Sequence, residues 1–295
     1  MNSPACNPCQ ICGKSIFRKL PYYYLLNGTK IHGVRCASCG LVTVSPMPTR
    51  EEISALYNEE YFQGDYNCGH RQSYEEESFS EMHRTVLERF VSLKPTGRFL
   101  EVGAAGGKFL LKAKEKGYEV MGVEVSPEAC RIAEKIGVPH FCGELKDARL
   151  PDGSFDLAYL GDVLEHLPEP YEALCELNRI LAPGGVIGLA CPANIGLLSS
   201  VVGLKVYSLL GKERFAPIPP YHLYEFTAHH LKMLIEKAGF EVLVVVADII
   251  PPWRIMLRGS MLEKIMKAAF HWPNYLITKL TGKMGDRVMV FARKR

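Results

Sequence analysis

A short apolar strand that runs into a turn of small residues constrains this chain more than any other stretch. Residues 99–102 are mostly apolar, and the turn at residues 103–107 carries almost no side chains. Such a turn lets backbone N–H groups approach a ligand at the N-terminus of the next helix. The stretch therefore predicts a nucleotide-cofactor loop, although an ordinary tight turn between a strand and a helix has a similar composition.

The spacing after the loop supports the cofactor interpretation. A second predicted strand, residues 118–124, ends in Glu124 about 20 residues after the loop, where doubly wound folds place an acid against ribose hydroxyls. Ser126 and Pro127 then begin a helix with an N-cap and an early proline. Further strands are predicted at residues 138–142, 155–160, 186–190, 240–247 and 287–292.

The loop resembles the first motif of the class I S-adenosylmethionine-dependent methyltransferases, hydrophobic-Glu/Asp-x-Gly-x-Gly-x-Gly. Glu101, Gly103 and Gly107 match it, and Ala105 replaces the middle glycine. S-adenosylmethionine has no phosphate, so the added methyl group is easier to accommodate than in a dinucleotide enzyme. The resemblance implies an α/β fold with a Rossmann-like, doubly wound, seven-stranded sheet whose last strand is antiparallel.

The same resemblance implies which residues bind the cofactor. Glu124 would bind the ribose, Glu144 and Leu145 the adenine, and Asp162 the methionine portion. A solvated turn is the alternative for residues 143–145. The complete predicted set is Glu101, Gly103, Ala104, Ala105, Gly107, Glu124, Val125, Glu144, Leu145 and Asp162.

Two Cys-x-x-Cys-Gly motifs near the N-terminus predict a metal site. The four thiols of Cys9, Cys12, Cys36 and Cys39 can complete a tetrahedral shell for Zn²⁺. A closed four-sulfur shell leaves no position for substrate, so this zinc would be structural. Two alternatives stay open, in which Cys6 replaces Cys9 as a ligand or all these thiols are free.

The N-terminal part as a whole resembles a branch of the methyltransferases that has a zinc ribbon and includes sugar methyltransferases. The expected division is a small zinc-ribbon module at 1–48, a helical linker and cover at 49–95, and a class I methyltransferase domain at 96–295. Inserts are expected at about 193–226 and 249–284. Tyr57, Tyr61 and Phe62 are candidates either for lining an acceptor pocket or for docking the ribbon.

Two histidines are candidate catalytic residues. In the sugar-methylating relatives a histidine before a Phe-Thr/Ser segment faces the acceptor, and His222 precedes Phe226 and Thr227 here. A histidine suits removal of a proton from the acceptor near neutral pH. His166 follows Glu165 in a second family-like stretch. For both histidines a structural hydrogen-bonding role is the alternative.

Charge and cysteine content limit the classes of partner. The formal net charge is only +3, without a concentrated basic stretch, so a nucleic-acid partner is not expected. Ten cysteines and an N-terminus without an apolar leader indicate the cytoplasm. The predicted function is S-adenosylmethionine-dependent methyl transfer to a small-molecule or glycan acceptor, which includes nucleotide-linked and lipid-linked sugars. The alternatives are an RNA methyltransferase that uses the ribbon, and a binding protein with a decayed cofactor site.

The segment at about 249–284 has an unusual composition. It holds both tryptophans, Trp253 and Trp272, several lysines and arginines, and one acid before Gly285, Glu263. Short helices of this composition suit a lid over the substrate or a peripheral membrane contact. No apolar run in the chain reaches the length of about 20 residues that spans a bilayer.

Overall fold

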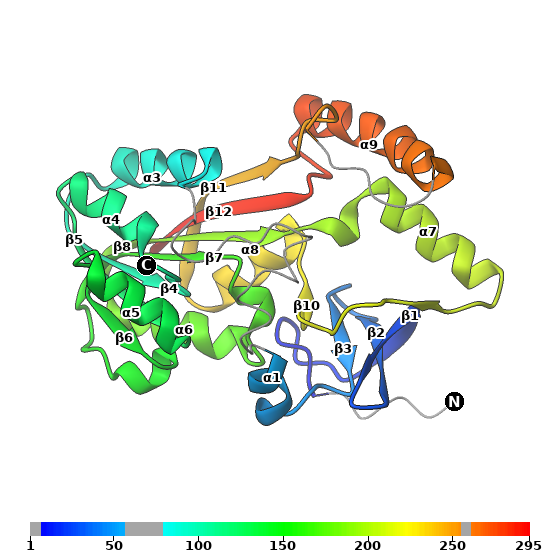
Figure 1. The fold of residues 1–295 in the computed structure, drawn as a ribbon, viewed down its shortest axis with the longest axis horizontal. Coiled ribbons are helices and arrows are strands. Elements are labelled where there is room, and N and C mark those ends of the chain that lie inside the picture. The colour runs from blue at the N-terminus through cyan, green and yellow to red at the C-terminus, as the bar shows by residue number, and fades with distance from the viewer. Residues whose placement is uncertain (1–6, 57–78, 255–260) are drawn as a thin grey trace. The chain divides into compact units, whose positions relative to one another are not determined.

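The structure is a computed structural model that describes residues 7–56, 79–254 and 261–295. Its strands form two sheets, one of seven strands and one of five (Figure 1). Tyr57, Tyr61 and Phe62, the candidates for an acceptor pocket, lie outside the described residues.

The seven-stranded sheet confirms the predicted doubly wound α/β fold. Each of the seven predicted strands is present, and β12 runs opposite to its neighbours (Figure 1). In sheet order the strands are β11 (Phe240–Asp248), β12 (Arg287–Lys294), β8 (Leu181–Pro192), β7 (Phe155–Gly161), β4 (Arg98–Val102), β5 (Glu119–Glu124) and β6 (His140–Cys142).

Strand β4, which leads into the small-residue loop, lies between two parallel neighbours. Phe99 pairs with Val120 of β5 on one side and with Leu157 of β7 on the other. The chain order therefore reverses at β4 and β7. Ligands of open α/β sheets bind outside the carboxyl ends of the strands at such a reversal. A ligand site is therefore expected at the carboxyl ends of β4, β5 and β7.

Helices precede and connect these strands. Ser80 caps α3 and Ser126 caps α5, each by accepting a hydrogen bond from a backbone N–H three residues later. Such a cap satisfies a donor that the helix itself leaves unpaired. The helices are α3 (Glu81–Leu93), α4 (Lys108–Glu115), α5 (Pro127–Lys135) and α6 (Pro170–Ile180).

Aromatic side chains make up much of the core beneath the loop. Phe90 of α3 lies 4.7 Å from Phe99 of β4 and 5.2 Å from Phe291 of β12, measured between ring centroids. Phe109 of α4 lies 4.8 Å from Tyr159 of β7. All five side chains are buried. Edge and tilted contacts of this kind add to the free energy gained by burial alone.

The five-stranded sheet joins the cysteine-rich N-terminal strands to two strands from much later in the chain. Thr43 pairs with Val34 of β2 and with Tyr224 of β10, both antiparallel. In sheet order the strands are β10 (Tyr224–Glu225), β3 (Val42–Ser45), β2 (Thr29–Cys36), β1 (Phe17–Leu26) and β9 (Arg214–Phe215).

The remaining elements are helical. Helix α9 is one helix of 21 residues with Pro273 inside it, so the expectation of short helices in this segment is wrong. None of the helices in the described part of the chain combines the length and apolar content needed to span a bilayer. The elements are α1 (Arg50–Leu56), η1 (Leu145–Ala148), η2 (Leu164–His166), η3 (Asn194–Gly196), α7 (Leu198–Leu209), α8 (Ala228–Lys237) and α9 (Met261–Thr281).

The chain divides into two compact units. One comprises residues 1–48, 190–234 and 244–290, and the other comprises residues 49–189, 235–243 and 291–295. The first contains the five-stranded sheet, α7 and α9. The second contains β4–β7 and the helices α3–α6 around them.

Candidate functional site

The loop after β4 has the backbone that its small residues permit. Gly103 has φ 70°, and a Cβ added there would overlap Cγ2 of Val163. Gly107 has φ 78° and occupies the N-cap position of α4. Ala105 also has a positive φ, 45°, which is an uncommon conformation for a residue with a side chain. The alanine therefore does not prevent the loop from folding as a glycine loop does.

Glu124 ties this loop to the next helix. Its Oε2 accepts a hydrogen bond of 2.9 Å from the backbone N–H of Ala105, and its Oε1 accepts one of 2.9 Å from that of Ser126. The side chain is buried, with only 7% of the residue exposed. A carboxylate offers about four acceptor positions, so two remain for a pair of hydroxyl donors. This arrangement fits a ribose, as the position of Glu124 in the sequence predicts.

The residue beside Glu124 offers an apolar surface. Val125 is 54% exposed, although both of its neighbours, Glu124 and Ser126, are buried. An exposed valine next to an acid that can bind a ribose suits contact with the face of a nucleobase.

Glu144, predicted to lie near the adenine, belongs to a group of surface ion pairs. Its Oε2 lies 3.3 Å from Nη1 of Arg50 and 2.8 Å from Nζ of Lys146, while Arg50 also reaches Glu169 at 2.8 Å. Exposed pairs such as these contribute little to stability. Arg50 is a residue that the sequence reasoning missed, because 94 positions separate it from Glu144. The adenine role of Glu144 and Leu145 stays a prediction.

The residues after β7 contact the loop after β4 on the side away from Glu124. Asp162 follows the strand with φ 55°, and Val163 packs against Gly103. Glu101 and Ala104 are buried within the same region, with 6% and 4% of each residue exposed. The structure therefore brings the predicted residues of β4, β5 and β7 to the carboxyl edge of the sheet. Val163 is another residue that the sequence reasoning missed.

The four predicted metal ligands come together. The sulfur atoms of Cys9, Cys12, Cys36 and Cys39 all lie within 4.8 Å of one another. Two of the distances are 3.5 Å, between Cys9 and Cys39 and between Cys12 and Cys36. A tetrahedral shell with Zn–S bonds of about 2.3 Å places sulfurs about 3.8 Å apart, so the four thiols fit one Zn²⁺.

Both cysteine motifs form the same kind of turn. Gly13 donates its N–H to the carbonyl of Cys9, and Gly40 donates to that of Cys36; both glycines have positive φ values. Burial raises the pKa of the Cys36 thiol, but backbone N–H groups of Cys39 and Ser38 outweigh this effect and lower that pKa to about 7. Backbone donors directed at a sulfur stabilise a thiolate.

The cysteine cluster is connected to helix α8 in the same compact unit. Nε2 of His230 lies 3.2 Å from the carbonyl oxygen of Cys39, and Nδ1 lies 3.1 Å from Oγ1 of Thr227. The N–H of His230 also donates to Oγ1 of Thr227, so Thr227 is the predicted N-cap of this helix. Burial lowers the pKa of His230, which favours the neutral imidazole.

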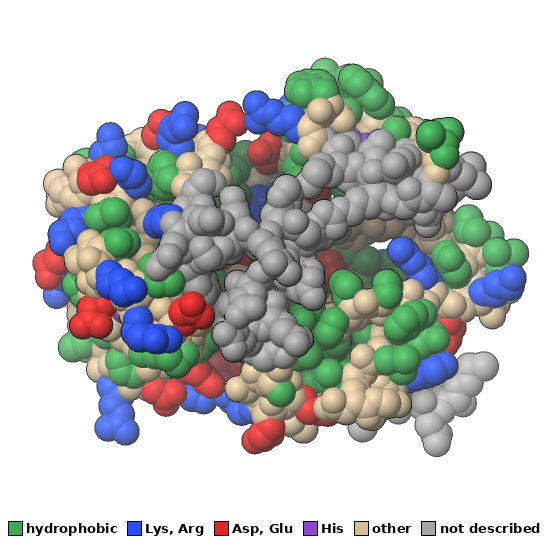
Figure 2. Space-filling model, in the orientation of Figure 1, with side chains coloured by type: hydrophobic (Ala, Val, Ile, Leu, Met, Phe, Trp, Pro, Cys, Tyr) green, Lys and Arg blue, Asp and Glu red, His purple; other side chains and the backbone are tan. Residues whose placement is uncertain are grey.

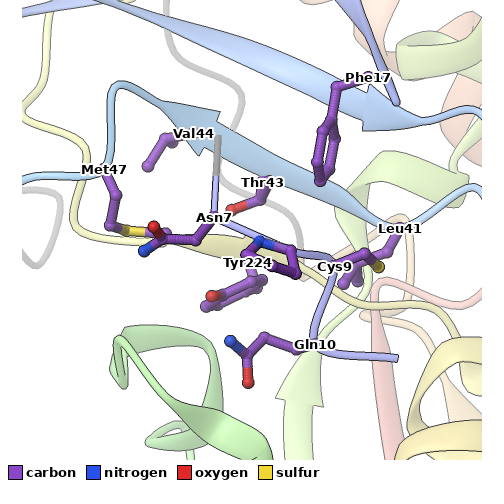
Figure 3. Close-up of a pocket in the computed structure, with 10 residues that line it drawn as sticks. Asn7, Cys9, Gln10, Phe17, Leu41, Thr43, Val44, Met47 and Tyr224 are labelled. Atoms are coloured by element: carbon purple, nitrogen blue, oxygen red, sulfur yellow. The ribbon is translucent and has the colours of Figure 1, made fainter. Parts of the chain in front are cut away.

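A small pocket lies beside the cysteine cluster, between strand β3, strand β10 and residues 7–10 (Figure 3). Its volume of about 20 Å³ holds about one water molecule, so it is not a cofactor site. The lining residues are Asn7, Pro8, Cys9, Gln10, Phe17, Leu41, Thr43, Val44, Met47 and Tyr224.

The two candidate catalytic histidines belong to different compact units. In one unit, Nδ1 of His222 lies 3.9 Å from Oε1 of Glu225, and 27% of the His222 side chain is exposed. In the other, Nε2 of His166 lies 3.7 Å from Oε1 of Glu165, and only 2% of the Glu165 side chain is exposed. Each histidine therefore has a carboxylate near it.

Comparison with protein families gives one clear match. A family model described as "Methyltransferase domain" matches residues 74–245, which is more than half of the chain.

Individual relatives are distant. A probable S-adenosylmethionine-dependent methyltransferase of Mycolicibacterium smegmatis is 27% identical over 172 residues, which cover 57% of this chain and 61% of that protein. A ubiquinone biosynthesis O-methyltransferase of Xanthomonas axonopodis pv. citri is 27% identical over 191 residues, covering 60% of this chain and 77% of that protein. The chain thus spans less than two thirds of the first of these relatives.

Among solved structures, an S-adenosylmethionine-dependent methyltransferase from Archaeoglobus fulgidus has a TM-score of 0.50 and 20% sequence identity. The similarity covers 80% of this chain and all of that chain, and it concerns the fold alone.

Proposed function

Because this chain belongs to the class I S-adenosylmethionine-dependent methyltransferases, we propose that it transfers a methyl group to a hydroxyl of a small-molecule or glycan acceptor. The observation that carries the proposal is Glu124, whose carboxylate holds both the N–H of Ala105 and the N–H of Ser126. This arrangement keeps the loop in the shape that a bound nucleoside needs.

Three of the predicted residues have a definite task in this proposal. Glu124 accepts hydrogen bonds from the two ribose hydroxyls, Val125 packs against the adenine, and Asp162 binds the ammonium group of the methionine portion. S-adenosylmethionine supplies, when bound, a methyl group that is already activated on a sulfonium. The protein then has to align the acceptor and remove its proton.

His222 is proposed as the group that removes this proton. An imidazole is neutral enough near pH 7 to accept a proton, and the carboxylate of Glu225, 3.9 Å from Nδ1, would stabilise the resulting imidazolium. His166, with the buried Glu165 beside it, is the second candidate for the same task.

The charges on the N-terminal module favour a small acceptor over RNA. An RNA partner would rely on Arg18, Lys19, Lys30 and Arg35. Lys19 pairs with Glu213 at 2.6 Å, and Nζ of Lys30 lies 4.3 Å from the ring centroid of Tyr23. Because of these contacts, the module presents only a weak positive charge to the phosphate backbone of an RNA. The relatives named above include a ubiquinone biosynthesis O-methyltransferase, which also favours a hydroxyl on a small molecule.

A binding protein with a decayed cofactor site is the less favoured alternative. The basis for this alternative is Ala105, yet this residue adopts the positive φ of a glycine loop and keeps its hydrogen bond to Glu124.

We further propose that Cys9, Cys12, Cys36 and Cys39 hold one structural Zn²⁺. The mutual distances of the sulfurs and the two matching glycine turns support this assignment. A four-sulfur shell is closed, so the zinc would stabilise the module and take no part in methyl transfer. Together these features support membership of the branch with an N-terminal zinc ribbon, for which sugars are the first acceptors to test.

The test is methyl transfer from radiolabelled S-adenosylmethionine to separate pools of nucleotide sugars, lipid-linked glycans, phenols and RNA. Labelling of a hydroxyl in one of the first three pools, strongly reduced in a His222→Asn variant that still binds the cofactor, is the expected result. Labelling of RNA alone would contradict the acceptor class and leave the enzyme class intact.

A further inference from the structure

Helix α9 has its polar and apolar faces reversed with respect to those of a water-exposed helix. Among the α9 side chains that the structure describes, the buried ones are polar: His271, Asn274 and Thr278 have exposed fractions of 6%, 1% and 3%. Hydrophobic side chains gather on the outside of α9 (Figure 2). The large apolar side chains that are exposed lie at helical spacing and are Met261 at 73%, Ile265 at 59%, Trp272 at 49%, Leu276 at 53% and Leu280 at 84%.

Hydrogen bonds fix the helix in this orientation. Nε2 of His271 lies 2.7 Å from the carbonyl of Ile250, and Oδ1 of Asn274 accepts a bond of 3.1 Å from the N–H of Leu198. The hydroxyl of Thr278 donates to the carbonyl of Asn274 at 2.8 Å. Turning the helix to bury the apolar stripe would break the bonds of His271 and Asn274 and leave polar groups unpaired, whereas the Thr278 bond lies within the helix and would turn with it.

Helix α7 extends the apolar surface. The contact of Leu198 with Asn274 joins it to α9, and no residue of α7 is buried. Its sequence contains no acid and only one charged residue, Lys205. The exposed apolar side chains of α7 and the residue after it are Val201, Val202, Val206, Leu209 and Leu210, of which Leu209 is 87% exposed.

Aromatic side chains gather at the same surface. The ring of Trp253, 65% exposed, lies 6.3 Å from that of Trp272 and 5.5 Å from that of Tyr275, measured between centroids. Tryptophan and tyrosine combine an apolar body with a polar tip and are enriched where protein meets the headgroup region of a bilayer.

The charged residues around this surface are predominantly cationic. Five exposed cations come from α7, α9 and the segments next to them: Lys205, Lys212, Arg254, Lys279 and Lys283. Two acids of these segments lie in ion pairs, Glu213 with Lys19 at 2.6 Å and Asp248 with Lys279 at 3.2 Å, and the second pair offsets the charge of one of the five cations. The charge is complementary to anionic lipid headgroups.

We propose that the exposed face of α7 and α9, together with Trp253, binds the surface of an anionic lipid bilayer with both helices lying in the interface. An apolar stripe bordered by cations and tryptophans is the pattern of interfacial helices. A second copy of the chain is a poorer occupant, because a two-fold contact would bring these cations against one another. The proposal does not depend on the identity of the methyl acceptor.

The experiment is co-sedimentation of the full zinc-loaded chain with vesicles. One set contains phosphatidylcholine alone and the other includes about a third phosphatidylglycerol. The test variant is Leu276→Glu/Leu280→Glu, and the matched control is Ile16→Glu, which changes another exposed aliphatic residue, 63% exposed, beside strand β1. Circular dichroism and titration with S-adenosylmethionine check that all three proteins are folded.

The expected result is binding to the anionic vesicles that is roughly tenfold or more weaker for the double variant, unchanged for the control, and weakened by added salt. Absence of binding by the unmodified chain would overturn the proposal, as would equal binding by the double variant or equal binding to neutral vesicles. A dimer in sedimentation equilibrium that the double variant abolishes, without vesicle binding, would assign the face to a second copy instead.

Discussion

Gly103 carries the tightest steric requirement in the cofactor loop, since its φ is 70° and a Cβ would overlap Val163. Gly103→Ala should lower the free energy of unfolding by about 2–4 kcal/mol, which combines backbone strain with overpacking. Denaturant unfolding measures this change.

Gly137→Ala is the matched control, because Gly137 has a similar φ of 75° but open space around it. Gly137→Ala should lower the free energy of unfolding by about 1–2 kcal/mol, which is the backbone strain alone. In the Gly103→Ala/Val163→Ala double variant, the added methyl group no longer meets the Val163 side chain. The double variant should therefore lose less free energy of unfolding than the sum of the two single variants. Equal losses for Gly103→Ala and Gly137→Ala would show that Val163 does not restrict the loop.

Glu124 is the side chain on which cofactor recognition depends most. Glu124→Ala should weaken S-adenosylmethionine binding by about 1.5–3 kcal/mol, because charge-assisted bonds to the ribose are lost. Calorimetric titration measures this change. Glu128→Ala, which alters an exposed acid four residues after Glu124, in the first turn of helix α5, should leave the affinity unchanged. Unchanged affinity in Glu124→Ala would remove the ribose assignment even if the thermal stability falls.

His140 of β6 should make the cofactor-binding fold sensitive to acid. Burial lowers the pKa of His140, so the unfolded chain binds its proton more tightly than the folded chain does. The associated stability is present above the unfolded pKa of about 6.5 and is lost as the pH falls through the folded pKa. Between pH 7.5 and 5, His140→Asn should therefore lose less stability than the unmodified chain. Parallel pH profiles of the two proteins would contradict this role.

The sequence reveals local relations between residues far better than distant ones. The links of Glu124 to Ala105 and Ser126 follow from a loop, strand and helix that are consecutive in the chain. The contact of Arg50 with Glu144 crosses 94 positions and has no local signal. Val163 likewise becomes part of the loop only because β4 and β7 are parallel neighbours.

At the scale of elements, strand β10 connects the cysteine module to the segment that holds His222. The carbonyl of Leu223 accepts bonds from Oγ1 of Thr43 at 2.9 Å and from the N–H of Val44 at 3.2 Å. If zinc stabilises this module, its removal should loosen the His222 segment as well. After chelation, hydrogen exchange should rise in peptides covering residues 222–231 and stay constant in those covering β4.

Cysteine variants separate zinc loss from nonspecific effects of the chelator. Cys39→Ser should lose the single bound zinc and reproduce the faster exchange, while Cys142→Ser, which changes an exposed thiol elsewhere, should keep the metal. Slow exchange at residues 222–231 in a zinc-free protein would show that β10 does not depend on the metal.

Element type follows from sequence more closely than element length. All seven predicted strands of the large sheet are present, but β8 begins at Leu181, five residues before the predicted start at residue 186. Helix α9 continues through Pro273, where the sequence favours a break. The buried bonds of His271 and Asn274 hold the helix on both sides of the proline, and their partners lie far away in the sequence.

At the scale of the whole molecule, the compact units combine distant parts of the chain. The N-terminal 48 residues form one unit with residues 190–234 and 244–290, whereas the expected division treats these segments as a separate ribbon and two inserts. Pairing of β10 with β3 and of β9 with β1 explains why the N-terminal module and the later segments are compact together. Strands of two residues are too short to be predicted from the alternation of apolar and polar residues.

Calorimetric titration of the zinc-loaded protein with S-adenosylmethionine, and separately with NAD, tests the central claim most directly. The loop, with Ala105 in place of a glycine and Glu124 across it, predicts binding of S-adenosylmethionine at about micromolar concentrations and no binding of NAD. Binding of NAD, or no binding of S-adenosylmethionine by a folded sample, would contradict the assignment of this loop as a methyl-donor site.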